Sequence, residues 1–406
     1  HADTSSIKRN GPSGFAWGSE KVRGVNLGGW LVLEPWITPS IFDRLNDGSD
    51  PQIVDEYTLG QQLGPQRALD EVFRPHWDSF MGFEDFRQIK NAGFNLVRIP
   101  IGYWAYDENP APFVPGAAPY MDAAIDWARS VGLTVMIDLH GAPRSQNGFD
   151  NSGQRRDDGP GWQQGDSVAR TLRVLKKIQD KYADPRYDDV IAGIELLNEP
   201  FLFSLDVDNY RQFVRDGYGQ TRDTSPSRVV VFSDGFLAPT EYNGFLTPDD
   251  GAHNVALDHH HYQVFSDAQV AQTPRQHREE LCGAFDGFSG SDKWTVIGEW
   301  SGAMTDCATY LNGFARGARF DGTLSSDSVF VGDCAPVNNF ALWDQRMKDY
   351  ARAWIEAQID VFERLDGWIF WTWKTEGSPE WDTRLLLGNG IFPQPLTDRR
   401  FPPACV

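Results

Sequence analysis

Long apolar runs and an excess of positive charge are both missing from this 406-residue sequence. No apolar run approaches the ~18 residues that a transmembrane helix needs. The net charge is −20 and the sequence pI is about 4.7. Phosphate backbones and anionic lipid surfaces would repel such a chain, so we expect neither nucleic acid nor a membrane among its partners. We expect it to act as a monomer.

Cysteine is also scarce, and no Cys-x-x-Cys pair occurs. Without such a pair, a zinc site or a thioredoxin-like site has little support. An even number of cysteines fits two disulfides in an oxidising compartment, so we expect a secreted or cell-wall protein. No Asn-x-Ser/Thr sequon and no signal peptide is visible, and we expect a mature chain that is exported without N-glycans. The four cysteines are Cys282, Cys307, Cys334 and Cys405.

Aromatic residues, in contrast, are abundant: they make up 13% of the chain, which contains 15 tryptophans. Sugar rings offer apolar C–H faces that stack on indoles, and hydroxyls that bind carboxylates. An acidic, tryptophan-rich chain therefore fits carbohydrate binding, although any single tryptophan more often belongs to a core.

Eight short apolar runs end in polar residues and alternate with helical patterns, which predicts eight strands. Helical spacing is clear at Met121, Ala124, Ile125 and Ala128, and at Val168, Leu172, Leu175 and Ile178 behind Asp166 as a candidate N-cap. The predicted strands are 22–30, 94–102, 134–141, 191–200, 228–236, 255–265, 294–301 and 367–374.

This alternation predicts an α/β fold, a (β/α)8 TIM barrel with long loop insertions on the C-terminal face. We assign residues 1–20 to an N-terminal extension and 21–406 to a single catalytic barrel domain. The insertions are 34–80, 141–165 and 302–340. A doubly wound open sheet is the alternative, but no GxGxxG follows the first strand.

Polar residues stand at the ends of most of these strands. Because the C-terminal strand ends of a TIM barrel converge, we expect one site there. Its members are Glu34, Arg98, His140, Asn198, Glu199, His260, Tyr262, Glu299 and Trp371.

Glu199 and Glu299 follow apolar runs of strands four and seven, across the barrel from each other. Glycoside cleavage needs such a pair, one carboxylic acid to protonate the leaving oxygen and one carboxylate to attack the anomeric carbon. Their proximity predicts coupled titration, with one of the two carboxyl groups protonated while the other is ionised. A buried ion pair of Glu299 with Arg98 is the structural alternative.

The triple histidine 259–261 could suggest a metal. Adjacent strand residues point to opposite faces, however, so His260 does not share a side with His259 and His261. We therefore expect no metal site, and no cofactor either. For His140 we expect a role as a sugar-hydroxyl donor.

At this point the sequence closely resembles glycoside hydrolase family 5, in particular the fungal exo-β-1,3-glucanases of that family. The resemblance runs from about Val22 to Cys405. It rests on the motifs VNLGGWLVLEPWITPSIF, QNGFDNSG, LLNEP, DHHHYQVF, GEWS and WTWKTE followed by PEW.

The resemblance implies that Glu199 is the acid/base, which stays protonated, and Glu299 the ionised nucleophile. Asn198 would hold the sugar 2-hydroxyl, while Arg98 and Tyr262 would position Glu299. Phe149 and Phe265 resemble the paired aromatics at the entrance that clamp the next glucose unit. The resemblance further implies substrate-binding roles for Glu34, His140, Asp150, His260, Trp371 and Trp381.

Four cysteines allow three pairings. We predict Cys307 with Cys334, which closes a loop within one insertion, and Cys282 with Cys405, which ties the C-terminal tail to the barrel; the family has the same pairing. Taken together, the expected activity is a secreted, metal-independent, retaining exo-β-1,3-glucanase that releases glucose from the non-reducing ends of β-glucan. Related enzymes also accept β-1,6 bonds and transfer glucose to other acceptors.

Three other functions remain open at this stage. An endo-acting β-glucanase, cellulase or mannanase of the same family would need an open groove. A non-catalytic β-glucan-binding protein would keep its activity without either glutamate. A metal-dependent barrel hydrolase would respond to a chelator.

Overall fold

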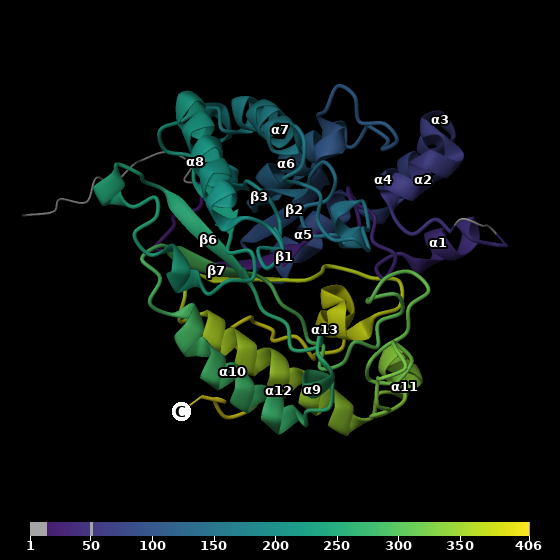
Figure 1. The fold of residues 1–406 in the computed structure, drawn as a ribbon. Helices are drawn as coiled ribbons and strands as arrows, with labels where there is room; N and C mark the ends of the chain where they lie inside the picture. The colour runs from purple at the N-terminus through teal and green to yellow at the C-terminus, as the bar shows by residue number, and fades with distance from the viewer. Residues whose placement is uncertain (1–13, 49–51, 406) are drawn as a thin grey trace, which may run out of the picture.

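The computed structural model describes residues 14–48 and 52–405. Within them, eight parallel strands form a closed barrel in sequence order (Figure 1). All eight predicted strands and the (β/α)8 barrel are confirmed. The strands are β1 Val22–Asn26, β2 Leu96–Gly102, β3 Thr134–Gly141, β4 Ile191–Glu195, β5 Val230–Ser233, β6 Val255–His260, β7 Trp294–Glu299 and β8 Gly367–Phe370.

Helices surround the barrel, and α7 with α8 and α10 with α12 lie side by side in Figure 1. Between β5 and β6 the described chain forms two short 3₁₀ turns in place of a helix. The α-helices are α1 Pro39–Leu45, α2 Glu56–Leu63, α3 Pro65–Ala68, α4 Arg74–Phe80, α5 Phe83–Asn91, α6 Ala118–Val131, α7 Ser167–Tyr182, α8 Val207–Thr224, α9 Asp267–Val270, α10 Pro274–Phe288, α11 Cys334–Asn338, α12 Gln345–Phe362 and α13 Thr383–Gly388. The short 3₁₀ or π segments are η1 Leu69–Phe73, η2 Tyr103–Ala105, η3 Asp150–Ser152, η4 Pro185–Tyr187, η5 Pro239–Tyr242, η6 Pro248–Asp250, η7 Phe340–Leu342 and η8 Pro379–Trp381.

The two helices that the apolar spacing predicted, α6 and α7, differ in how well the predicted face matches the buried one. All four periodic residues of α6 are buried, as predicted. In α7 the buried face includes Thr171 and Val174, whereas Val168 and Leu172 are only partly buried. Asp166 occupies the N-cap position of α7, but its side chain makes no capping hydrogen bond there. The apolar pattern therefore located this helix correctly but misplaced its buried face.

Two layers of side chains fill the barrel below the site. The lower layer is apolar and includes Leu96, Met136, Val231, Ala256, Val296 and Ile369. Side chains two residues further along a strand point the same way, so β2, β3 and β6 carry Arg98, Asp138 and Asp258 above that apolar layer. Asn26 and Glu195 complete this polar layer, and all five polar side chains are buried.

The N-terminal end of the barrel is closed by residues that precede β1. The Trp17 indole donates a hydrogen bond to the Ala192 carbonyl (2.8 Å) and stacks on Trp294 at 5.7 Å. Phe15 packs edge-on against Trp17, at 5.3 Å. Phe15 and Trp17 belong to the predicted N-terminal extension, residues 1–20, of which residues 1–13 lie outside the described part of the chain.

Both predicted disulfides are confirmed. Cys307 pairs with Cys334, 27 residues away, and Cys282 pairs with Cys405, 123 residues away. The first closes the insertion after β7, and the second joins α10 to the C-terminal tail. As to membranes, none of the helices in the described residues has both the length and the apolar character needed to cross one.

Candidate active site

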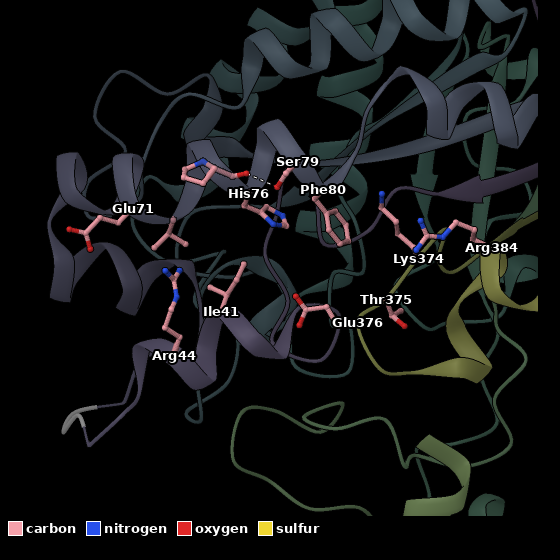
Figure 2. A pocket seen from close by; sticks show the side chains of 12 residues that line it. Ile41, Arg44, Glu71, His76, Ser79, Phe80, Lys374, Thr375, Glu376 and Arg384 are labelled. Carbon is pink, nitrogen blue, oxygen red and sulfur yellow. Dashed lines mark hydrogen bonds between the residues drawn. The ribbon is translucent and has the colours of Figure 1, made fainter. Parts of the chain in front are cut away.

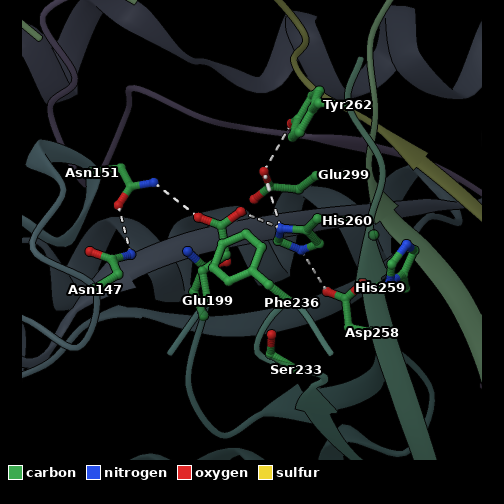
Figure 3. A network of polar contacts seen from close by, with 12 residues as sticks. Asn147, Asn151, Glu199, Ser233, Phe236, Asp258, His259, His260, Tyr262 and Glu299 are labelled. Carbon is green, nitrogen blue, oxygen red and sulfur yellow. Dashed lines mark hydrogen bonds and ion pairs between the residues drawn. The ribbon is translucent and has the colours of Figure 1, made fainter. Parts of the chain in front are cut away.

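Two buried glutamates face each other at the carboxyl ends of the strands (Figure 3). Glu299 is the last residue of β7, and Glu199 lies beyond β4. One carboxylate oxygen of each glutamate and one ring nitrogen of His260 all lie within 4.8 Å of one another. Tyr262 donates its hydroxyl hydrogen to Glu299 Oε2 at 2.9 Å, and Asn151 Nδ2 donates to Glu199 Oε2 at 3.2 Å.

Glu199 lies off the strand that we predicted to carry it. The ladder of β4 ends at Glu195, because the chain turns away before Asn198 and Glu199. The Asn198 amide still donates to the Leu139 carbonyl at 2.9 Å, so the turn stays attached to β3. Glu199 has a φ of 44°, a left-handed conformation that costs a non-glycine residue about 1–3 kcal/mol and is typical of functional sites.

Arg98 is the centre of the polar layer under the two glutamates. Its guanidinium donates to Glu299 Oε1 at 3.0 Å, to Glu195 Oε2 at 2.8 Å and to Asn198 Oδ1 at 2.8 Å. Burial lowers the pKa of Arg98, but the surrounding carboxylates, Asp138 foremost, outweigh it and hold the pKa well above its ordinary value. Arg98 thus stays charged and holds one oxygen of Glu299 by a hydrogen bond.

The three consecutive histidines separate as strand geometry predicts. His260 points into the site, where its Nδ1 lies 2.7 Å from Glu199 Oε1 and its Nε2 lies 3.2 Å from Asp258 Oδ2. His259 instead bonds Asp234, and His261 packs edge-on against Phe288. Gly298 leaves room for Asp258, since a Cβ there would lie 2.0 Å from Asp258 Oδ1.

Burial and His260 govern the ionisation of the two glutamates. Burial raises the pKa of Glu199, but the hydrogen bond and positive charge of His260 outweigh it, so this pKa lies below its ordinary value. Burial also raises the pKa of Glu299, where the charge of His260 offsets only part of the effect and the net pKa is raised. Burial lowers the pKa of His260 itself, yet the charges of Glu299 and Asp258 hold it well above the ordinary value.

This order is the reverse of the one that we expected from the sequence. The expectation placed the proton on Glu199, whereas in this site Glu299 has the higher pKa. The physical reason is the position of His260, whose Nδ1 lies 2.7 Å from a Glu199 oxygen but 3.4 Å from Glu299 Oε2. His260 therefore stabilises ionised Glu199 through a hydrogen bond that Glu299 lacks, and the charge of Glu199 in turn raises the pKa of Glu299.

A cavity of about 850 Å³ opens above the two glutamates. This volume lies within the range of about 300–1,000 Å³ that is usual for small-molecule sites. Two of the predicted insertions form its walls, through residues 147–160 and 311–319. It is lined by ten of the predicted site residues: Glu34, Phe149, Asp150, Glu199, His260, Tyr262, Phe265, Glu299, Trp371 and Trp381.

The other three predicted residues, Arg98, His140 and Asn198, adjoin the cavity rather than line it. Arg98 and Asn198 are joined to the glutamates as described above. The His140 ring stacks on Trp371 at 5.5 Å, and its Nδ1 lies 2.6 Å from Asp138 Oδ2. The structure therefore gathers all the predicted site residues at one end of the barrel.

Several buried polar atoms at this cavity have no hydrogen-bond partner among the described residues. They are Glu34 Oε1, His140 Nε2, Asp150 Oδ2, Asn198 Nδ2 and Trp381 Nε1. Burial, reinforced by the charge of Asp150, holds the pKa of Glu34 well above its ordinary value. Burial and the charge of Asp55 raise the pKa of Asp150 to about 7. A buried polar atom without a partner is costly, so these donors and acceptors are suited to a ligand with many hydroxyls.

Several contributors to the site were missed in the sequence, among them Asn26 and Glu195 of the polar layer. Asp138 and Asp258 lie two residues before His140 and His260, so the period of two in a strand could have indicated them. Trp36 donates its indole hydrogen to Glu34 Oε2 at 2.8 Å. Asn151, within the QNGFDNSG motif, reaches Glu199 through loop geometry that no sequence spacing indicates.

A metal ion could in principle use Glu199, His260 and Glu299, whose ligand atoms lie close together. Metal binding requires a neutral imidazole with a free nitrogen. In His260, however, both ring nitrogens face carboxylates and the raised pKa favours the protonated ring. The residues present therefore fit an imidazolium between carboxylates better than a metal ligand set.

A second hollow, of about 450 Å³, lies between α1, α4 and the segment after β8 (Figure 2). Lys374 borders it, lies over the Phe80 ring at 5.2 Å and bonds Asp85 at 3.0 Å. Burial lowers the pKa of His76, also at this hollow, to about 4. None of the predicted site residues is among the described residues that line it. We therefore assign the catalytic chemistry to the larger cavity.

A (β/α)8 barrel with two buried glutamates facing each other across one cavity defines a glycoside hydrolase. A family model described as "Cellulase (glycosyl hydrolase family 5)" matches residues 76–319. The chain belongs to glycosyl hydrolase family 5.

Curated relatives match nearly the full chain. A protein of Blumeria graminis named "Glucan 1,3-beta-glucosidase" is 46% identical over 398 residues, which cover 96% of this chain and 91% of the relative. A protein of the same name from Candida oleophila is 43% identical over 412 residues, covering 100% of this chain and 96% of the relative.

Solved structures support the fold. The crystal structure of rutinosidase from Aspergillus niger has a TM-score of 0.73 and 18% sequence identity, and the match covers 94% of this chain and 100% of that chain. At this identity the likeness concerns the barrel architecture alone.

Proposed function

We propose that this protein is an exo-β-1,3-glucanase that releases glucose from the non-reducing ends of β-1,3-glucans. The observation that carries the proposal is the close pair of Glu199 and Glu299 at the floor of a cavity walled by residues 147–160 and 311–319. Relatives named "Glucan 1,3-beta-glucosidase" support the substrate class. A walled pocket favours a chain end over the interior of a polymer.

The first step is a displacement at the anomeric carbon. Glu299 Oε attacks this carbon and forms a glycosyl ester, while the bond from the carbon to the glycosidic oxygen breaks. Glu199 gives its proton to that oxygen, which leaves as a hydroxyl of the shortened chain. Carboxyl groups about 5–5.5 Å apart are typical of this retaining route, whereas inverting enzymes separate them by about 6.5–9.5 Å. The oxygens within 4.8 Å support the retaining route.

The second step restores the enzyme. Glu199, now ionised, takes a proton from water, the hydroxyl oxygen attacks the anomeric carbon, and the ester bond to Glu299 breaks. Glucose leaves with the β configuration because two displacements have occurred. A second sugar hydroxyl in place of water would give transglycosylation, and we propose that β-1,6 acceptors and bonds are also tolerated.

The reactive state needs a proton on Glu199 and none on Glu299. His260 Nδ1 faces both carboxylates, at 2.7 and 3.4 Å, so it can give its proton to Glu199 and accept one from Glu299. The total number of protons is unchanged by this exchange. Arg98 and Tyr262, which donate to the two oxygens of Glu299, then stabilise the ionised nucleophile.

The terminal glucose is proposed to fill the pocket between Trp371 and the unpaired polar atoms. Asn198 Nδ2, beside the nucleophile, is suited to the 2-hydroxyl, and Glu34, His140, Asp150 and Trp381 to other hydroxyls or ring faces. Phe149 and Phe265, which are 40% and 47% exposed, are proposed to contact the next glucose unit at the mouth. Two disulfides support a secreted or cell-wall location, and a site built from one chain supports a monomer.

A timed digest of linear β-1,3-glucan tests the proposal. We expect glucose as the sole product from the first minutes, and proton NMR before mutarotation should find the β anomer. A ladder of oligomers would favour the endo-acting alternative, and α-glucose would overturn the retaining route. Loss of activity with a chelator would favour the metal-dependent alternative. Binding of the glucan without any turnover would favour the alternative of a non-catalytic β-glucan-binding protein.

A further inference from the structure

Four phenylalanine rings form a continuous series that leads away from the cavity. Phe149 lies 5.8 Å from Phe201 and 6.5 Å from Phe236, centroid to centroid. Phe201 contacts Phe236 at 5.8 Å and Phe203 at 5.6 Å. All four contacts are edge-to-face, a favourable arrangement for aromatic pairs. Phe203 is the outermost ring of the series.

The inner part of the series belongs to the cavity, and the outer part faces water. Phe149, Phe201 and Phe236 line the same cavity as the two glutamates, and Figure 3 draws Phe236 beside Glu199. Phe203 does not line it and is 69% exposed. Phe203 therefore continues a contiguous apolar surface out of the cavity, and such exposed apolar patches often mark ligand-binding grooves.

The backbone holds these rings in place. Phe201 and Phe203 follow the acid/base candidate within the sequence Glu199-Pro200-Phe201-Leu202-Phe203. Leu202, between them, is buried, whereas Phe201 is half-buried and Phe203 is exposed. The Phe201 amide donates to the Gln146 carbonyl at 3.0 Å, and its carbonyl accepts from Ser204 at 3.0 Å.

We infer that Phe201 and Phe203 bind glucose units of the departing glucan beyond the second, and so extend the site along its leaving side. The inference rests on the proposed function. The floor of the cavity is closed by the polar layer under Glu299, so the rest of the chain must run outward past Phe149. A pyranose ring presents apolar C–H faces to aromatic rings, and these two rings continue the surface that the second unit would contact.

The consequence is a preference for longer chains. A disaccharide ends before it reaches Phe203, whereas a longer oligosaccharide gains one or two further ring contacts. An aryl glucoside has no glucose on the leaving side at all. The value of kcat/KM should therefore rise with chain length beyond laminaribiose in the wild-type protein.

The test compares Phe203→Ala with the matched control Phe330→Ala. Phe330 is similarly exposed, at 66%, and does not line the cavity. We would measure kcat/KM for an aryl β-glucoside and for laminari-oligosaccharides of two to six units. Phe203→Ala should lower kcat/KM about 3- to 10-fold for the longer oligosaccharides alone, and Phe203→Tyr should restore it. Phe330→Ala should match the wild type throughout.

The outcomes separate the inference from the proposed function. If wild-type protein hydrolyses laminari-oligosaccharides and Phe203→Ala keeps the same dependence on chain length, the inference is wrong and the proposed function stands. An equal loss on every substrate, the aryl glucoside included, would also overturn it. If wild-type protein cleaves no β-1,3 bond, both fail together.

Discussion

His260 Nδ1 lies 2.7 Å from Oε1 of Glu199, and its charge lowers the pKa of this glutamate and also that of Glu299. Replacing His260 with Gln keeps a hydrogen-bonding side chain but removes the charge. An acid and a base that must be in opposite ionisation states give kcat/KM a bell-shaped dependence on pH. Both carboxyl pKa values should rise in the variant, so both limbs of this profile should move to higher pH.

The pH profile of an aryl glucoside measures this shift. His259→Gln is the control, because His259 bonds Asp234 instead of the glutamates. We expect His260→Gln to lower kcat as well, since the group that can exchange protons between the glutamates is lost. An optimum that stays at the wild-type pH, or moves lower, would contradict the assigned role.

Glu299→Gln should remove nearly all turnover, because an amide cannot form the glycosyl ester. We expect a loss of more than about 10³-fold in kcat on both glucan and aryl glucoside. Binding of laminari-oligosaccharides, followed by calorimetry, should survive, since the amide keeps the shape of the pocket. Activity within about tenfold of the wild type would exclude Glu299 as the nucleophile.

Glu199→Ala should separate substrates by their leaving groups. An aryl glucoside with a good leaving group needs little protonation, so its first step should be spared relative to glucan. Azide should then restore turnover by attacking the glycosyl ester and yield β-glucosyl azide. Equal losses on both substrates without any rescue would argue that another group supplies the proton.

Much of this site can be predicted from the sequence, because the burial of each strand is visible in its own short run of residues. Strands of a parallel barrel are buried on both faces, so each appears as a short apolar run, and their carboxyl ends necessarily meet. That reasoning places Arg98, His260 and Glu299 together without any knowledge of the loops.

The remainder depends on distances that no pattern encodes. The order of the two carboxyl pKa values depends on whether His260 lies nearer to Glu199 or to Glu299, a difference between 2.7 and 3.4 Å. Asn151 reaches Glu199 only because an insertion folds back over the barrel, and the end of β4 at Glu195 depends on where the chain turns. The periodicity of the sequence therefore predicts neither the path of a loop nor the position of a side chain to within an ångström.

Glu380 should make stability depend on pH. Burial raises its pKa from 4.5 to about 8, although Met304 and Thr305 donate to it. Between these values the unfolded carboxyl is ionised and the folded one is protonated, so the folded state binds more protons. Stability should fall as the pH rises through this window, by at most about 1.4 kcal/mol per pH unit from this group.

The comparison of Glu380→Gln with the wild type in chemical denaturation isolates this effect. The two proteins should differ little at pH 5, and the variant should gain relative to the wild type towards pH 8, because its amide does not ionise in either state. Glu279→Gln is the control, since Glu279 pairs with Arg275 on the exposed face of α10. Parallel stability curves for Glu380→Gln and wild type would rule the effect out.

The two disulfides should contribute similarly to stability but differ in their effect on the KM for glucan. Removing either pair by Ser substitution should lower the free energy of unfolding by about 2–4 kcal/mol. Loss of Cys307–Cys334 should also raise KM for glucan, because this bridge lies in the insertion that supplies residues 311–319 of the cavity wall. Loss of Cys282–Cys405 should leave KM unchanged, and an equal rise in KM for both pairs would contradict this division.

The barrel is closed at its N-terminal end by Trp17 and by the apolar layer beneath Arg98. In the described part of the chain, substrate and products therefore enter and leave by the same open side of the cavity, its mouth, where Phe149 and Phe265 are exposed. Events at this mouth must follow a fixed order. The shortened glucan has to depart before water can reach the glycosyl ester, and glucose has to depart before the next chain end can enter. Accumulated glucose should consequently compete with substrate, and the sugar concentration at the mouth should set the balance between hydrolysis and transfer.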